Sequence, residues 1–139
     1  MRFLQSFCLA AVALTTPATA QQGEPVFACY DDMRGVMDRL ITTRQIQDLM
    51  LRFGGGDEMT ESQLDALDAS VERLYPQDFE NVATLRRIVH ENGFVEELLA
   101  YWTGYTYLYA YVFYHDRGEE VVSINFRFNS DYAKLTGLF

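Results

Sequence analysis

The chain has 139 residues, 49% of them hydrophobic and 14% aromatic, which suits a single domain with one hydrophobic core. Its 20 acidic residues outnumber its 11 basic residues, and the formal net charge is −9. This charge repels phosphate backbones and anionic lipid surfaces, so it argues against nucleic acid and membranes as partners.

The first twenty residues have the layout of a secretory signal peptide. Arg2 supplies a positive charge, residues 7–14 form a short apolar run, and residues 18–20 read Ala-Thr-Ala, a typical cleavage site. The apolar run is too short to span a bilayer. We therefore expect cleavage before Gln21, a periplasmic or secreted location, and one domain over residues 21–139.

Such processing would leave a single cysteine, because Cys8 lies within the apolar run. The fold would then have no intramolecular disulfide. We expect Cys29 to be buried beside Phe27. The alternatives are pairing with another chain and a reactive thiol.

Helical periodicity begins after Asp31 and Asp32, which favour the positive end of a helix dipole. Apolar residues then recur at helical spacing in two sets: Met33, Val36, Met37, Leu40 and Ile41, followed by Ile46, Leu49, Met50 and Phe53. Thr42 and Thr43 between the sets either cap a second helix or bend one long helix. Three glycines at 54–56 end this region, because glycine disfavours helix interiors.

The next helix begins at Thr60, since Thr60 and Gln63 have the spacing of a capping box. Its apolar stripe is Leu64, Leu67, Val71 and Leu74, with Asp65, Asp68 and Glu72 toward solvent. Pro76 ends it.

Residues 78–93 predict one more helix. Asp78 is the expected cap, Phe79, Val82, Leu85 and Val89 share a helical stripe, and Asn92-Gly93 closes the element with His90 in its last turn. Residues 94–102 favour a short helix as well. The alternative is a strand, which would end in a hairpin turn at Thr103-Gly104.

Residues 105–115 form the clearest strand of the chain. Strand geometry places side chains alternately on two faces. One face would carry Tyr105, Tyr107, Tyr109, Tyr111 and Phe113, and the other Thr106, Leu108, Ala110 and Val112. A helix would scatter these tyrosines around its circumference.

A hairpin at Asp116-Arg117-Gly118 joins this strand to the alternating run 119–128, and its length decides what shares the tyrosine face. A two-residue loop would place Tyr111 opposite Ile124. A three-residue loop with Gly118 in the left-handed region is favoured, because it requires positive φ of glycine alone. It places Ser123, Asn125 and Arg127 on the tyrosine face. A turn at 129–131 and a short strand over 132–139 would follow.

The candidate functional surface is therefore the tyrosine face, because tyrosine offers a large contact area and a hydroxyl at small entropic cost. Its residues are Tyr105, Tyr107, Tyr109, Tyr111, Phe113, Ser123, Asn125 and Arg127. It would serve as a pocket for a small amphipathic ligand or as an interface for a protein partner or homodimer. The alternative is that helices cover it as ordinary core.

An enzyme is the second hypothesis. His115 lies beside Asp116 at a strand end, and Cys29 with His90 or His115 offers a nucleophile and a base. The glycines at 54–56 are followed by acidic residues and by no Lys-Ser/Thr pair, so they do not form a phosphate loop. We predict no metal and no cofactor.

Taken together, the pattern predicts an α+β fold in which N-terminal helices pack on one face of a C-terminal antiparallel β-meander of three or four strands. Residues 121–128 followed by 134–139 resemble the closing strand pair of small exported nuclear-transport-factor-2-like proteins, the cystatin-superfamily cone. The resemblance covers the last third of the chain. It implies a curved sheet cupping helices, with a pocket at the mouth of the cone or a sheet-to-sheet dimer, and it carries over no catalytic residues.

Overall fold

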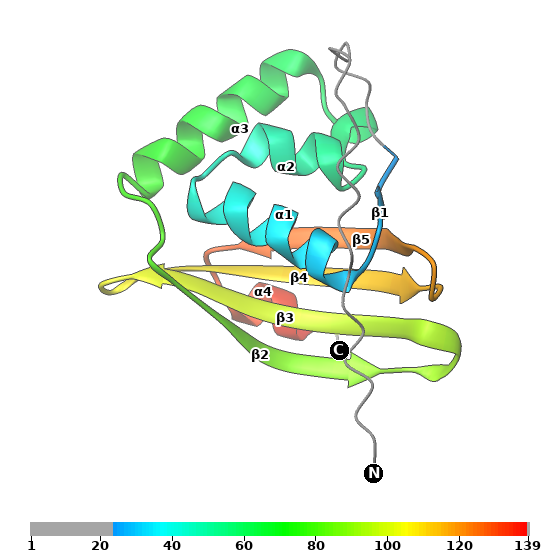
Figure 1. Ribbon diagram of the computed structural model, residues 1–139. Coiled ribbons are helices and arrows are strands. Elements are labelled where there is room, and N and C mark those ends of the chain that lie inside the picture. The colour runs from blue at the N-terminus through cyan, green and yellow to red at the C-terminus, as the bar shows by residue number, and fades with distance from the viewer. Residues whose placement is uncertain (1–23, 139) are drawn as a thin grey trace.

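In the computed structural model, which describes residues 24–138, three helices lie on one face of a five-stranded antiparallel sheet (Figure 1). The helices are α1 (Tyr30–Thr42), α2 (Ile46–Arg52), α3 (Glu61–Leu74) and α4 (Ala133–Thr136), with single 3-10 turns η1 (Gly56–Glu58) and η2 (Glu91–Gly93). The strands are β1 (Val26–Phe27), β2 (Asn81–Val89), β3 (Phe94–Thr103), β4 (Thr106–Asp116) and β5 (Val121–Asn129), in the order β1-β5-β4-β3-β2. The predicted α+β class and its arrangement are confirmed, with five strands in place of three or four. The expected signal peptide and its cleavage site lie outside the described residues.

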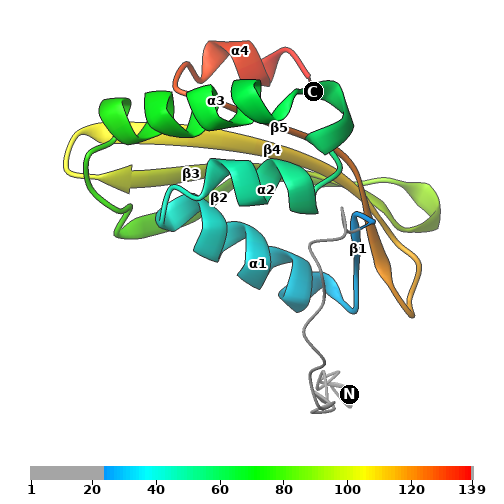
Figure 2. The ribbon, with the colours of Figure 1, turned by 90° about the horizontal axis from the view of Figure 1, so that it is seen from above.

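The two sets of apolar residues near the N-terminus form two separate helices, which settles the alternatives at Thr42-Thr43. Arg44 lies between α1 and α2 and has a φ of 60°, which interrupts the helical conformation. The side chain of Asp68 on α3 then accepts hydrogen bonds from Ile46 N and Gln47 N, each at 3.0 Å, and so caps α2. Asp68 was expected to face solvent, and the structure corrects this, because α2 and α3 pack side by side (Figure 2).

The predicted capping box of α3 is confirmed. Gln63 N donates to Thr60 Oγ1 at 3.2 Å, and Thr60 N donates to Gln63 Oε1 at 2.8 Å. Leu64 and Val71 are buried, whereas Leu74 at the end of the stripe is 64% exposed.

The helix predicted over 78–93 is wrong, because residues 81–89 form strand β2. Two features conceal the strand: β2 lies at the edge of the sheet, and a bulge at Leu85 interrupts its alternation, since Thr84 pairs with Leu99 but Arg86 with Leu98. Asp78 caps no helix and instead forms an ion pair with Arg44 at 2.7 Å. His90 accordingly precedes η2 in the β2–β3 connection.

The short helix favoured over 94–102 is also wrong, and the alternative of a strand holds. Strand β3 lies between β2 and β4, and residues 97–101 are buried on both faces of the sheet, so its apolar residues run on without alternation. Thr103 pairs with Thr106, which leaves Gly104 and Tyr105 as the turn, and Gly104 has a φ of 57°. Tyr105 therefore belongs to the turn and not to the strand.

The β4–β5 hairpin has neither of the two expected loops. Asp116 pairs with Val121 across a four-residue loop, and Arg117 N donates to Glu120 O at 2.9 Å. A bulge at Ile124 then shifts the register, so that Tyr114 pairs with Ser123 whereas Phe113 pairs with Asn125.

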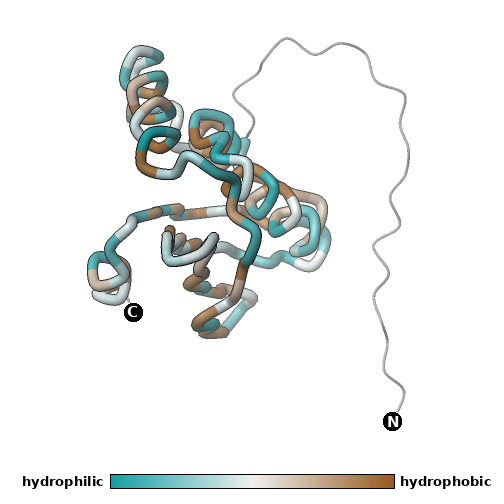
Figure 3. The backbone as a smooth tube through the Cα atoms, turned by 90° about the vertical axis from the view of Figure 1, so that its left-hand side faces the viewer, coloured by the Kyte–Doolittle hydropathy of each residue, from teal (hydrophilic) through white to brown (hydrophobic). Residues whose placement is uncertain are grey.

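The last strand predicted over 132–139 is replaced by α4. Asp131 N donates to Asn129 Oδ1 and Ala133 N donates to Asp131 Oδ1, and these two side-chain turns start the helix. Figure 3 shows this C-terminal segment apart from the layer of the three N-terminal helices. Its buried residue Leu135 packs with Leu98 and Tyr111, on the face of the sheet that those helices leave uncovered.

The main core lies between helices α1, α2 and α3 and the face of the sheet that they cover. Its central members are fully buried: Met33, Met37, Ile41, Ile46, Leu49, Leu99, Tyr101, Ala110 and Val112. The aliphatic side of β4 thus faces the helices, as the alternation predicts.

Glycine at position 93 is required by backbone geometry. Gly93 has a φ of 85°, and a β-carbon there would collide with the carbonyl oxygen of Asp116. We expect Gly93→Ala to lower the free energy of unfolding by at least about 2 kcal/mol, measured by urea denaturation. Gly35→Ala is the control, because Gly35 lies within α1 with open space around it. It should leave stability equal or raise it by up to about 1 kcal/mol. Equal losses in both variants would contradict this account.

Candidate interaction face

The face of the sheet turned away from α1, α2 and α3, here called the outer face, carries a row of aromatic rings. Trp102 pairs with Tyr107 across β3 and β4, and their rings lie 6.3 Å apart at 19°. Tyr107 and Tyr109 follow at 6.3 Å and 7°. Tyr132 meets the ring of Tyr109 edge-on at 5.4 Å. We call these four residues the aromatic ladder.

Helix α4 divides the outer face into a covered and an open part. Leu135 buries Leu98 and Tyr111, and Phe113 packs against the same cluster. Tyr111 is only 6% exposed, so the structure removes it from the candidate contact residues. The covered-core alternative therefore applies to this half of the face.

The open part lies at the β3–β4 hairpin. Tyr105 at the turn is 99% exposed, Tyr107 is 42% exposed and Tyr132 is 46% exposed. Large aromatic side chains with this much exposed surface are unusual when they occur together. The ladder thus forms a patch at one end of the sheet.

The polar residues predicted for this face are divided by the bulge at Ile124. Arg127 pairs with Tyr111 and Asn125 with Phe113, so both lie on the outer face as expected. Ser123 pairs with Tyr114 and is 3% exposed on the helix side, which corrects its predicted place. The four-residue loop alone would have placed Phe126 among the tyrosines, and the bulge prevents this.

A hydrogen-bonded chain of three side chains fixes the covered part. Glu96 accepts from Tyr111 through Oε1 at 2.7 Å and contacts His90 Nε2 through Oε2 at 2.7 Å. Burial raises the pKa of the Glu96 carboxyl, but the hydrogen bonds from Tyr111 and His90 and the nearby positive charges outweigh it, and the pKa is lowered. Burial, followed by the bond to Glu96, raises the pKa of the Tyr111 hydroxyl.

The residues named in the enzyme hypothesis make contacts that support the fold. His115 Nε2 lies 2.8 Å from the carbonyl oxygen of Asn92, which only accepts, so this nitrogen carries the proton. The His115 ring stacks on Phe94 at 4.1 Å and 8°. Cys29 is partly buried at the N-terminal cap of α1 and makes no hydrogen bond to His90 or His115 in the described part of the chain.

A buried polar network on the helix side had no signal in the sequence. Its centre is Glu97, which is 1% exposed. Tyr30 of α1 donates to Glu97 Oε1 at 2.9 Å, and Arg87 Nε lies 3.3 Å from the same oxygen. Arg34 lies 3.8 Å from Glu97 Oε2. These residues come from three elements, so no local pattern announces them.

The network extends along α1. Tyr101 donates to Asp38 at 2.6 Å, and Arg34 bonds both Asp38 at 3.3 Å and Thr84 at 3.1 Å. Burial chiefly, and then Asp38, raise the pKa of the Tyr101 hydroxyl. Burial likewise raises the pKa of Tyr114 to about 12. The network therefore attaches α1 to β2 and β3 through the buried Glu97 and the mostly buried Arg34, with the more exposed Asp38 and Arg87 at its margin.

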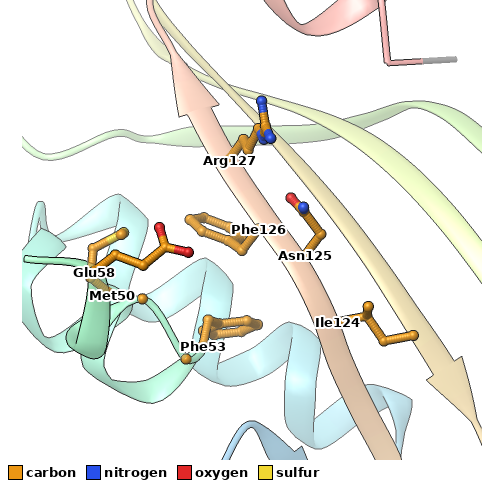
Figure 4. Close-up of a pocket in the computed structure, with 9 residues that line it drawn as sticks. Met50, Phe53, Glu58, Ile124, Asn125, Phe126 and Arg127 are labelled. Carbon is orange, nitrogen blue, oxygen red and sulfur yellow. The ribbon is translucent and has the colours of Figure 1, made fainter.

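A cavity of about 220 Å³ lies where the loop after α2 meets β5 (Figure 4). Its lining is Met50, Phe53, Gly54, Gly55, Glu58, Ile124, Asn125, Phe126 and Arg127. Asn125 and Arg127, predicted for the tyrosine face, thus also border a separate site.

Within residues 24–138, no three His, Cys, Asp or Glu side chains gather as metal ligands would. The same residues contain no helix long and apolar enough to cross a bilayer.

Comparison with known proteins gives no relative. No family model matches the chain, and neither a curated protein nor a solved structure is significantly similar to it. The resemblance to nuclear-transport-factor-2-like proteins therefore stays a prediction.

The Glu97 network predicts a large effect on stability. Glu97→Ala removes the buried carboxylate that Tyr30, Arg34 and Arg87 share and leaves Arg34 with only the partly exposed Asp38, so we expect a loss of about 3 kcal/mol in the free energy of unfolding. Tyr30→Phe removes one hydrogen bond to the carboxylate and should cost about 1.5–3 kcal/mol. Urea denaturation followed by circular dichroism measures both. Glu72→Ala on the exposed side of α3 is the control and should change stability by less than about 0.5 kcal/mol. A loss in Glu97→Ala no larger than in this control would refute the role of the network.

The lowered pKa of Glu96 predicts a pH dependence. A carboxyl with a depressed folded-state pKa stabilises the fold above its unfolded value of about 4.5, and this stabilisation is lost as the pH falls through the folded-state pKa. Glu96→Gln should therefore be less stable than the unmodified protein at pH 7, and the difference should shrink toward pH 3.5. Denaturation midpoints at pH 7, 5 and 3.5 test this, with Glu91→Gln on η2 as the charge-removal control. A difference that stays constant with pH would be contrary to the expectation.

Proposed function

We propose that the chain is an acidic, exported binding module that uses the open end of its outer face to bind a protein partner. The observation that carries the proposal is the aromatic ladder, with Tyr107 42% exposed and its ring parallel to its neighbours. Tyr and Trp are enriched at the centres of protein interfaces, because they bury a large area with few rotatable bonds.

The position of α4 supports a limited contact. Because Leu135 and Tyr111 occupy the middle of the outer face, a partner meets only the hairpin end, from Trp102 to Tyr132. This disfavours packing of two whole sheets face to face. A second copy of the chain is less favoured than a basic protein, because it carries the same net charge of −9.

The net charge of −9 favours a partner with a basic rim around an apolar centre. Glu80 precedes Asn81, the residue that pairs with Trp102, and Asp131 precedes Tyr132. Both acidic residues are exposed and add to this charge. Export, which rests on the leader-like residues 1–20, is a part of the same proposal.

The test replaces the exposed rings. Trp102→Ala with Tyr107→Ala should weaken partner binding by about 30-fold or more, as expected for interface aromatic residues, while the denaturation midpoint changes little. Sedimentation equilibrium of the protein alone measures self-association first. For other partners, a photo-cross-linking amino acid in place of Tyr105 should give one discrete adduct in the periplasmic or secreted fraction.

Leu74 provides the matched control, because it is an equally apolar residue, 64% exposed, on α3. The same cross-linker at position 74 should give no discrete adduct. If both positions give the same adducts, or if the double variant binds as tightly as the unmodified protein, the ladder is not the interface.

A further inference from the structure

The edge of the sheet at β5 is paired over only part of its length. Strand β1 pairs with Val121 and Val122, and Ser123 N donates to Pro25 O at 2.8 Å. From Ile124 to Asn129, no other strand of residues 24–138 lies along this edge. Unpaired edge strands present backbone N–H and C=O groups that accept a further strand.

Residues 24–26 form a tight turn beside this edge. Val26 N donates to Glu24 O at 2.7 Å, which closes a tight turn. Arg52 of α2 then bonds Glu24 O at 2.9 Å and Val26 O at 2.7 Å. These bonds hold residues 24–26 against α2. The pairing of β1 with β5 therefore does not extend past Ser123, where the open edge of β5 begins.

The cavity of about 220 Å³ borders the unpaired part of β5. Figure 4 shows Phe53, Phe126 and Met50 on its helix side, with the carboxylate of Glu58 pointing toward the ring of Phe126. The rings of Phe53 and Phe126 lie 5.2 Å apart. Pockets for whole small molecules begin at about 300 Å³, so this volume suits one apolar side chain better.

We propose that the open edge of β5 binds an extended peptide by strand addition, with one apolar side chain in the cavity and a basic side chain against Glu58. The peptide continues the β1–β5 pairing past the bulge at Ile124. Backbone hydrogen bonds supply affinity in this mode, and the cavity supplies selectivity. Glu58, the neighbouring Asp57 and the net charge of −9 together outweigh the one cationic side chain of the lining, Arg127, and favour a basic peptide.

The probe is the acetylated and amidated heptapeptide TKVFVKT, in which Phe and both Lys side chains share one face of a strand. Binding to the protein is measured by calorimetry, and amide hydrogen exchange locates it. We expect slower exchange within residues 125–129 and at least tenfold weaker binding when Ala replaces the central Phe. Two further peptides carry N-methyl groups on alternate backbone amides, one peptide for each of the two possible registers. Only every second amide faces β5, so one methylated register should bind at least tenfold more weakly and the other should bind almost as the parent peptide does.

Charge exchange provides the matched variants. Glu58→Lys should weaken TKVFVKT at least fivefold and should favour TEVFVET instead. Glu119→Lys, an equal charge change at an exposed position in the β4–β5 loop, should leave both affinities unchanged. The variant Trp102→Ala with Tyr107→Ala should bind TKVFVKT as the unmodified protein does, so failure of the aromatic ladder and failure of this site are separate results.

Three outcomes would overturn the proposal. They are the lack of saturable binding by TKVFVKT, equal binding of both methylated registers, and exchange protection at 102–109 in place of 125–129. Self-association that Glu58→Lys abolishes would show instead that a second copy of the chain occupies the edge.

Discussion

The buried carboxylate of Glu97 is the interaction on which the arrangement of layers depends. A carboxyl group that is 1% exposed is tolerated only with hydrogen-bond or ion-pair partners, and Tyr30, Arg34 and Arg87 supply them from α1 and β2. Because these partners lie on one side of the sheet, the network fixes α1 on that side. Helices α2 and α3 follow through short connections and through the cap that Asp68 gives α2. The opposite face is thereby left to the tyrosines.

The bulge at Ile124 decides which side chains of β5 lie on each face of the sheet. A four-residue loop starts β5 in a register that would mix Phe126 with the tyrosines, and one extra residue reverses this. Beyond the bulge, Phe126 and Phe128 pack against the helix-side core, and Asn125 and Arg127 face outward. The β1 pairing stops beside this bulge, where residues 24–26 form a tight turn, so the sorted face and the open edge meet at Ile124.

The two proposed surfaces lie on different parts of the molecule and have different chemistry. The aromatic ladder offers broad rings at the β3–β4 hairpin, whereas the edge of β5 offers backbone groups beside a small cavity. Both belong to an acidic chain, and both therefore favour basic partners. The ladder meets β5 only at Asn129, which pairs with Tyr109, whereas the cavity lies beside residues 124–127.

The sequence by itself determined what local chemistry specifies: the helical periodicity of α1 and α2, the capping box at Thr60, and the alternation of β4, since each depends on neighbours in the chain. The sequence pattern favoured helices in place of β2 and β3, because an edge bulge in β2 and burial on both faces of β3 remove the alternation. It also predicted a strand at the C-terminus, where Asn129 and Asp131 start a helix. Only the tertiary structure decided the β4–β5 register, the burial of Tyr111 under Leu135, and the Glu97 network. These depend on contacts between residues distant in sequence, whose energies no local pattern records.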